Sequence, residues 1–98
     1  MHESAATRGV AVATLTVANE LGLHARAATM LVRLAAGYAS ELYVSKDGNE
    51  VNGKSIMSVL LLTATKGSKI EIRAVGDDAV ELVAAVSRLV ADKFGEPA

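Results

Sequence analysis

The chain has 98 residues, which suits one domain, and its 10 basic and 11 acidic residues leave a net charge of −1. That balance gives no overall attraction to nucleic acid or to an anionic membrane surface. The absence of cysteine excludes disulfides and thiolate sites. No stretch reaches the roughly 18 apolar residues needed to cross a bilayer, so we expect a cytoplasmic protein with no direct membrane insertion.

The first residues differ in character from the rest. Residues 1–9 are small and polar without periodicity, which predicts a flexible N-terminal tail before one domain over residues 10–95. Alternating apolar residues from Val10 to Ala18 predict the first strand. The face expected to meet the helices consists of Ala13, Leu15 and Val17. Asn19 follows in a loop, where its side chain either ties the loop down or only helps the chain to turn.

Gly22-Leu23-His24-Ala25-Arg26 joins this strand to a helix predicted over Ala25 to Ala36. Gly22 allows a tight turn. The first N–H groups of a helix have no partner within it, and with the helix dipole they form a natural anion site. The positive helix end favours a neutral, nucleophilic imidazole at His24, and Arg26 adds a guanidinium for a phosphate. The junction predicts a phosphoryl acceptor; the alternative is a surface histidine that ends a turn.

The predicted first helix has an apolar stripe and a basic stretch. The inward stripe consists of Ala27, Met30, Leu31, Leu34 and Ala35. From Leu21 to Ser40 the chain carries no acidic residue, whereas Arg26 and Arg33 lie within it. This distribution indicates either a face for an acidic partner or a phosphate, or a chance feature of a short window.

Three further strands follow. A short strand over Glu41 to Ser45 is followed by Asp47-Gly48, a strong signal for a two-residue hairpin, and by a third strand over Glu50 to Asn52. Lys69 to Ala74 alternates apolar and charged residues and is predicted to be the last strand, buried on one face only.

A short second helix is predicted over Ser55 to Leu62. Serine is a preferred N-cap, so Ser55 has either a capping role alone or a second role as a phosphorylation target. The apolar side chains that follow form an adaptable docking patch if some of them stay exposed. The candidate docking residues are Ile56, Met57 and Leu60.

The last helix is expected to begin with Asp77 as its N-cap and to end before Gly95 and Pro97. Its predicted buried stripe consists of Leu82, Val83, Val86, Leu89, Val90 and Phe94. The carboxylates of two pairs, Asp78 with Glu81 and Asp92 with Glu96, have the spacing of metal ligands, but no histidine is near in sequence. We therefore expect a solvated helix face there and no metal site.

The order β-α-β-β-α-β-α, with one-sided strands and amphipathic helices, predicts an α+β open-faced β-sandwich. In this architecture three helices cover one face of a four-stranded antiparallel sheet. Many unrelated proteins share such folds, so the architecture alone does not assign a function.

The motif Gly22-Leu23-His24-Ala25-Arg26 resembles the active-site signature of HPr, the histidine phosphocarrier of the bacterial phosphoenolpyruvate:sugar phosphotransferase system. Val51-Asn52-Gly53-Lys54-Ser55-Ile56-Met57 resembles the regulatory serine segment of the same family, and the element order fits from Val12 to Phe94. One departure is Ala27, where the family usually has proline. Alanine forms helix well, so the helix is expected to survive without the fixed φ of a proline.

The resemblance implies a carrier rather than an enzyme, with no cofactor. Nδ1 of His24 would accept a phosphoryl group from an Enzyme I-like kinase and pass it to sugar-specific Enzyme IIA-like acceptors. Arg26 and the backbone N–H groups of Ala25, Arg26 and Ala27 would hold the phosphate. Ser55 would receive a regulatory phosphate from an HPr serine kinase/phosphorylase, and the segment after it would contact partners. A monomer is expected, because a carrier must meet several partners in turn.

Three other classes of function differ from a carrier in what they require of the sequence. A regulatory HPr-like interaction protein in nitrogen, carbon or stress signalling would keep the fold and use Ser55 as its switch. A nucleic-acid-binding sheet would need basic and aromatic residues on its open face, and Thr14, Thr16, Glu71 and Arg73 do not supply that pattern. A hydrolase or metalloenzyme lacks a nucleophile with its base or a ligand cluster.

Overall fold

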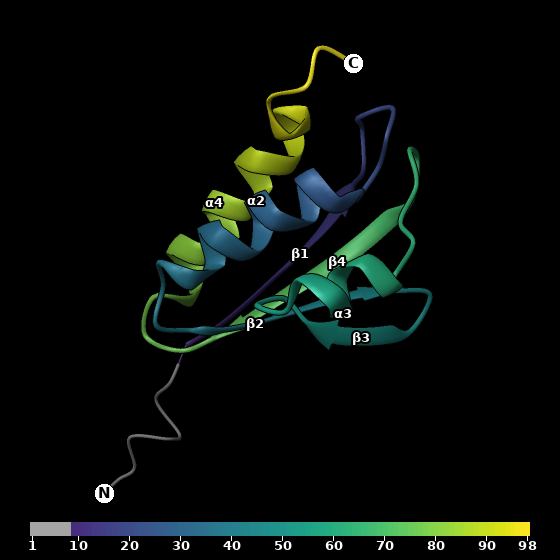
Figure 1. Cartoon of the computed structure of the whole chain (residues 1–98). Coiled ribbons are helices and arrows are strands. Elements are labelled where there is room, and N and C mark those ends of the chain that lie inside the picture. The colour runs from purple at the N-terminus through teal and green to yellow at the C-terminus, as the bar shows by residue number, and fades with distance from the viewer. Residues whose placement is uncertain (1–8) are drawn as a thin grey trace, which may run out of the picture.

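The computed structural model describes residues 9–98, so the predicted flexible tail lies outside the described residues apart from Gly9. The elements are β1 (Val10–Thr16), α2 (Ala25–Ala36), β2 (Glu41–Lys46), β3 (Asn49–Asn52), α3 (Ile56–Leu61), β4 (Lys69–Val75), α4 (Ala79–Ala91) and the 3-10 turn η1 (Lys93–Gly95) (Figure 1). The predicted order β-α-β-β-α-β-α is confirmed, and the predicted boundaries of α2 are also those observed.

The four strands form one antiparallel sheet in the order β1-β4-β2-β3. β4 lies between β1 and β2, with Ile72 opposite Ala13 on one side and Val44 on the other. The β2–β3 hairpin turns through Asp47 and Gly48, whose φ values of 53° and 82° are those required by a two-residue hairpin turn. The predicted hairpin is therefore confirmed.

The helices cover one face of the sheet, and the other face is open to solvent (Figure 1). β4 displays this division residue by residue, because Ile70, Ile72 and Ala74 are buried whereas Lys69 and Glu71 are exposed. The predicted α+β open-faced β-sandwich, a four-stranded antiparallel sheet with three helices, is confirmed.

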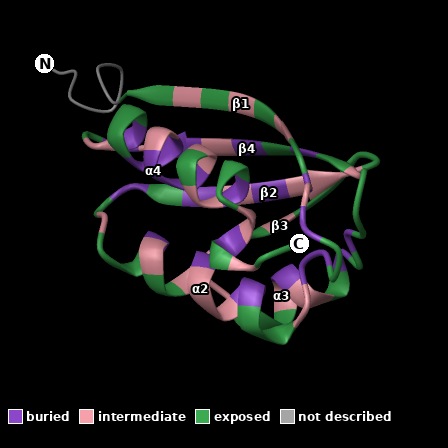
Figure 2. Cartoon of the chain, turned by 90° about the horizontal axis from the view of Figure 1, so that it is seen from above, coloured by how far each residue is buried: buried purple, intermediate pink, exposed green. Residues whose placement is uncertain are grey.

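The core between sheet and helices consists mainly of aliphatic residues, with alanine and valine the most frequent. Figure 2 shows these buried positions in purple on the strands and helices. Of the stripe predicted for α2, Ala27, Leu31 and Ala35 are buried and Met30 and Leu34 are half-buried. Of the stripe predicted for the last helix, Leu82, Val83, Val86, Val90 and Phe94 are buried, whereas Leu89 is half-buried. Small side chains on α2 let its backbone lie close to its neighbours, which holds the start of this helix firmly in the fold.

The start of α4 differs from the prediction. The N-cap position is occupied by Asp78 rather than Asp77, and its side chain does not cap the helix. Its carboxylate instead accepts hydrogen bonds from the N–H groups of Ala39 (2.9 Å) and Ser40 (2.8 Å) and from the Ser40 hydroxyl. These bonds, the one from the Ser40 hydroxyl above all, hold the pKa of Asp78 below its ordinary value. The carboxylate thus joins α4 to the loop before β2.

Candidate functional site

His24 occupies the N-cap position of α2, at the end of the loop that follows β1. Its backbone is extended, with φ −75° and ψ 180°, and its carbonyl accepts a 2.8 Å hydrogen bond from the N–H of Ala28. The imidazole makes no capping bond to the helix, so it projects from the junction instead of folding back on it. The side chain is 28% exposed, which leaves the ring accessible to a partner.

Gly22 shapes the loop that carries this histidine. Its φ is +64°, and a Cβ atom there would lie 2.4 Å from the carbonyl oxygen of Ala64. That same carbonyl accepts a 2.9 Å hydrogen bond from the N–H of Leu23. Only glycine combines the left-handed conformation with this close approach. The turn expected from sequence is thus present, and a second loop holds it in place.

The start of α2 offers backbone donors beside the ring. Within the described part of the chain, no acceptor is found for the N–H groups of Ala25, Arg26 and Ala27. Ala27 is fully buried and lies in the first turn, so the helix forms without a proline at this position, as predicted. Arg26 is exposed and makes no hydrogen bond among residues 9–98. Three N–H groups and one guanidinium are therefore available to an anion at this end of the helix.

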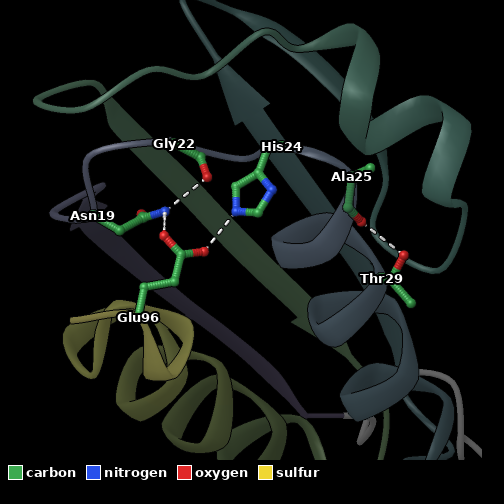
Figure 3. Close-up of polar contacts among 6 residues, drawn as sticks. All are labelled: Asn19, Gly22, His24, Ala25, Thr29 and Glu96. Carbon is green, nitrogen blue, oxygen red and sulfur yellow. Dashed lines mark hydrogen bonds and ion pairs between the residues drawn. The ribbon is translucent and has the colours of Figure 1, made fainter. Parts of the chain in front are cut away.

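Glu96, which follows η1, contacts the imidazole. Its Oε2 lies 2.5 Å from Nε2 of His24, and its Oε1 accepts a 3.0 Å hydrogen bond from Nδ2 of Asn19 (Figure 3). Asn19 is fully buried, and its Nδ2 also donates to the carbonyl of Gly22 at 2.8 Å. The bond from His24, followed by that from Asn19, holds the pKa of Glu96 below its ordinary value. The carboxylate is thus ionised at neutral pH and held by two side chains.

The role of Glu96 was not predicted. We expected a solvated helix face, and this is wrong, since the side chain is only 9% exposed and points at a histidine 72 positions earlier. No local pattern around Glu96 signals the contact, because it depends on how η1 turns the chain. For Asn19 the two alternatives were a tie across the loop and a simple turn; the bond to Gly22 shows the tie.

A hollow of about 290 Å³ lies beside the ring. It is lined by Glu20, Leu21, His24, Arg26, Glu96, Pro97 and Ala98. The carbonyl of Ala98 accepts a 2.7 Å hydrogen bond from the N–H of Glu20, so the segment after Glu96 is pinned to the loop before His24. The hollow is therefore formed by three segments: the loop before His24, the start of α2 and the residues after η1.

The electrostatics of the hollow are mixed. The positive end of α2 is not the only charge beside the imidazole, because the carboxylate of Glu96 contacts Nε2. A neutral ring therefore stays a prediction. The stretch from Leu21 to Ser40 lacks acidic residues, but Glu20 and Glu96 line the same hollow as Arg26. The positive charge that the sequence predicts for this face is therefore partly balanced by two carboxylates beside the imidazole.

Ser55 is the N-cap of α3 and is half-buried. Its Oγ accepts a 3.3 Å hydrogen bond from the N–H of Ser58, which confirms the capping role. Ser55 does not line the hollow beside His24. The two candidate sites are therefore separate features, on helices that pack against each other.

The candidate docking residues lie on α3 with unequal exposure. Met57 is 69% exposed, Ile56 is exposed to a lesser degree, and Leu60 is half-buried. Leu61, which was not among the candidates, is 70% exposed. An apolar surface therefore exists on this short helix, with Leu61 rather than Leu60 as its second prominent side chain.

Within residues 9–98, no three histidine, aspartate or glutamate side chains gather as a metal site. No helix in the described part of the chain is long and apolar enough to cross a bilayer. A larger groove of about 740 Å³ lies between α2 and α4, away from the ring, with Leu34 and Leu89 among its lining residues. Its lining includes Tyr38, Arg88 and Asp92 but no histidine, so the hollow beside His24 is the better candidate for a phosphoryl acceptor.

The fold is an open-faced sandwich, and an accessible histidine lies beside free N–H donors at the start of its first helix. These features define a small protein that can hold an anionic group on a histidine side chain. Comparison with known proteins identifies the family. The family model described as "PTS HPr component phosphorylation site" matches residues 11–92. The chain belongs to the HPr family, the phosphocarriers of the phosphotransferase system.

Relatives support this assignment in sequence and in structure. The phosphocarrier protein HPr of Neisseria meningitidis is 41% identical over 83 residues, which cover 85% of this chain and 93% of the relative. HPr from Thermoanaerobacter tengcongensis superposes with a TM-score of 0.87 at 38% identity, covering 90% of this chain and 99% of that one. HPr from Bacillus anthracis gives a TM-score of 0.80 at 34% identity, covering 84% and 98%.

Proposed function

We propose that the chain is a cytoplasmic carrier that accepts a phosphoryl group on Nδ1 of His24. An Enzyme I-like, phosphoenolpyruvate-dependent kinase supplies the group, and sugar-specific Enzyme IIA-like proteins accept it. The observation that supports this most is the orientation of the ring. Nε2 contacts Glu96, while Nδ1 lies on the side of Ala25, where α2 begins (Figure 3).

The transfer needs little covalent chemistry from this domain. The lone pair of Nδ1 attacks phosphorus, the bond from phosphorus to the donor breaks, and the donor keeps that electron pair. In the second transfer the Nδ1–P bond breaks and its electron pair returns to the imidazole. The charge on the phosphoryl oxygens is what the protein must stabilise. The N–H groups of Ala25, Arg26 and Ala27 and the Arg26 guanidinium suit that task, since hydrogen bonds to charged groups contribute about 1.5–3 kcal/mol each.

Ser55 fits a regulatory role in the same proposal. A phosphate on its Oγ would meet the N-terminal end of α3, where negative charge is tolerated, so the domain would stay folded. The same dianion would lie beside the apolar surface of Ile56, Met57 and Leu61 and would weaken docking of a partner there. An HPr serine kinase/phosphorylase is the proposed source of that phosphate.

The test is intact-mass spectrometry after incubation with phosphoenolpyruvate and purified Enzyme I. We expect one added phosphoryl group that is lost in acid, because phosphohistidine is acid-labile. His24→Ala is expected to abolish it. His2→Ala is the matched control, because His2 is the other histidine of the chain.

Two outcomes would contradict the proposal. An unlabelled wild-type chain that is folded by circular dichroism would remove the carrier function and favour the regulatory alternative. An acid-stable label that persists in His24→Ala would move the modification to a hydroxyl group, for which Ser55→Ala is the next variant.

A further inference from the structure

A row of hydrogen bonds links Asn19, Glu96 and His24. The carbonyl of Gly22 at one end of this row determines which atoms donate and which accept. The carbonyl of Gly22 can only accept, so the Asn19 amide must present its nitrogen to it. The second hydrogen of the same nitrogen then points to Oε1 of Glu96. The carboxylate of Glu96, ionised at neutral pH, offers only acceptors to the imidazole. The nitrogen that faces it, Nε2, must therefore carry a proton.

We propose that Glu96 is a positioning residue for phosphoryl transfer, which holds the proton of His24 on Nε2 and so leaves the lone pair on Nδ1. The inference rests on the proposed function of His24. A neutral imidazole has one N–H, and the hydrogen bond made by one nitrogen decides the state of the other. With Nε2 protonated, Nδ1 is the nucleophile, and it lies on the side of the α2 donors (Figure 3).

Glu96 also bears on the phosphorylated ring. Once Nδ1 is bonded to phosphorus, the proton stays on Nε2 and the ring carries positive charge. The carboxylate on Nε2 balances that charge, and it keeps the ring from rotating away from the helix end. When the phosphoryl group leaves with its Nδ1 bond broken, the electron pair returns to Nδ1 and the ring is again neutral.

The backbone before Glu96 makes a left-handed turn, which directs the carboxylate toward the imidazole. Lys93, Phe94 and Gly95 have φ values of 56°, 55° and 76°. Two successive non-glycine residues in the left-handed region are unfavourable by about 1–2 kcal/mol each. The turn is held by the fully buried Phe94 and by a 2.9 Å hydrogen bond from the N–H of Glu96 to the carbonyl of Lys93. Backbone strain of this kind often accompanies a functional position.

The first test reads the tautomer directly, by two-bond ¹H–¹⁵N correlation spectra of the imidazole in the unphosphorylated protein. We expect the Nε2–H tautomer in the wild type at neutral pH. In Glu96→Gln the Asn19 amide should take the new carbonyl oxygen, which turns the new NH₂ group toward Nε2. The ring should then shift toward the Nδ1–H tautomer, which has no lone pair on Nδ1.

The control is Glu71→Gln, which is the same substitution at an exposed position on the open face of β4. It should leave the tautomer unchanged, and amide spectra of both variants should retain the wild-type pattern outside the substituted residue. Glu96→Ala provides a second variant, because it removes the carboxylate without adding a donor. A mixture of tautomers is expected there.

The second test is the rate of single-turnover transfer from phosphorylated Enzyme I. Glu96→Gln should lower this rate on the order of ten- to a hundredfold, the range found when the carboxylate behind a metal-bound histidine is removed. Glu71→Gln should transfer at the wild-type rate.

The outcomes separate the two proposals. If the wild type accepts no phosphoryl group, the proposed function is wrong, and the role of Glu96 in transfer is wrong with it. If the wild type is phosphorylated but its tautomer and rate are the same in Glu96→Gln, the role of Glu96 alone is overturned. A wild-type ring protonated on Nδ1 would also overturn it.

Discussion

The carboxylate of Glu96 lies 2.5 Å from Nε2 of His24, although 72 positions separate the two residues. Asn19 ties the other oxygen of the same carboxylate to the loop before His24. The end of the described chain and the start of α2 are therefore one polar unit. A disturbance of η1, far along the sequence, should reach the imidazole through this contact.

The first prediction concerns the loss of folding stability at acidic pH. The pKa of Glu96 is lowered in the folded protein by the bonds from His24 and Asn19, and that of Asp78 is lowered by the bonds from Ser40 and Ala39. A carboxyl group with a depressed folded-state pKa contributes stability that is present above its unfolded value and is lost as pH falls through the folded value. The unfolding free energy should therefore fall with pH from about 4.5, the ordinary value for glutamate, downward.

Urea unfolding at pH 7, 5, 4 and 3 measures this effect. Glu96→Gln and Asp78→Asn should each show a smaller loss between pH 5 and pH 3 than the wild type, because each removes one of the shifted groups. Glu71→Gln is the control and should follow the wild-type curve. Parallel curves for wild type and Glu96→Gln would contradict the assignment.

The second prediction concerns the turn before His24. Gly22→Ala should lower the unfolding free energy by at least about 1–2 kcal/mol from the left-handed backbone alone. The clash with the Ala64 carbonyl, 2.4 Å from the new Cβ, should add to that. Gly67→Ala is the matched control, since its φ is +88° and nothing lies within 4 Å of the added atom. Chemical denaturation of both variants gives the comparison, and equal losses would mean that the clash is relieved by a small shift of the loop.

The third prediction concerns η1. Phe94 is fully buried, and Phe94→Ala should lower the unfolding free energy by about 3–5 kcal/mol, the usual cost of removing a buried phenyl ring. The phenyl ring of Phe94 holds the turn that directs Glu96 toward His24. The variant should therefore also lose the contact between Glu96 and Nε2, which would change the imidazole NMR spectrum of His24. Leu61→Ala, at an exposed site, should change stability by no more than about 0.5 kcal/mol. A destabilised Phe94→Ala with an unchanged imidazole spectrum would separate η1 from the site.

Much of the fold followed from local patterns, and the reasons are visible in particular residues. The alternation of Ile70, Ile72 and Ala74 was enough to assign the buried face of β4, and Asp47-Gly48 was enough to assign the hairpin. In both cases the signal and the structure it specifies lie within a few residues. The boundaries of α2 followed in the same way from its apolar spacing and from Gly37 at its end.

The missed features depend on contacts between distant segments. Asp78 faces the loop before β2, so its carboxylate is engaged there and the N-cap expected at Asp77 moves by one residue. The sequence pattern places Glu96 in solvent, because nothing near it in sequence indicates the left-handed turn through Lys93 and Phe94. Half of the candidate site was therefore predictable, namely the histidine and its helix; the carboxylate that holds the ring was not.

The fourth prediction concerns Ser55 as a switch. Ser55→Ala removes the acceptor for the Ser58 N–H and should cost about 0.5–2 kcal/mol of stability, the usual range for losing an N-cap. Ser55→Asp keeps a good N-cap, so its stability should stay close to that of the wild type. The added charge should still weaken binding to an Enzyme IIA-like acceptor, measured by titration calorimetry. Ser55→Thr keeps the cap and adds no charge, so it should bind like the wild type; equal weakening in Ser55→Thr would point to shape rather than charge.

The last prediction concerns the apolar surface of α3. Met57 and Leu61 are each about 70% exposed, so replacing them removes little buried area and should leave stability within about 0.5 kcal/mol. If partners dock here, Met57→Ser and Leu61→Ser should each weaken binding to Enzyme I or an Enzyme IIA-like protein by about 1 kcal/mol or more, the loss that marks an energetically important interface residue. Val80→Ser on α4 is the matched control, because Val80 is equally exposed but lies on a different helix. Equal affinities for all three variants would move the docking surface away from α3, whereas a loss confined to the α3 variants would place the partner beside the Ser55 cap, where a phosphate repels it.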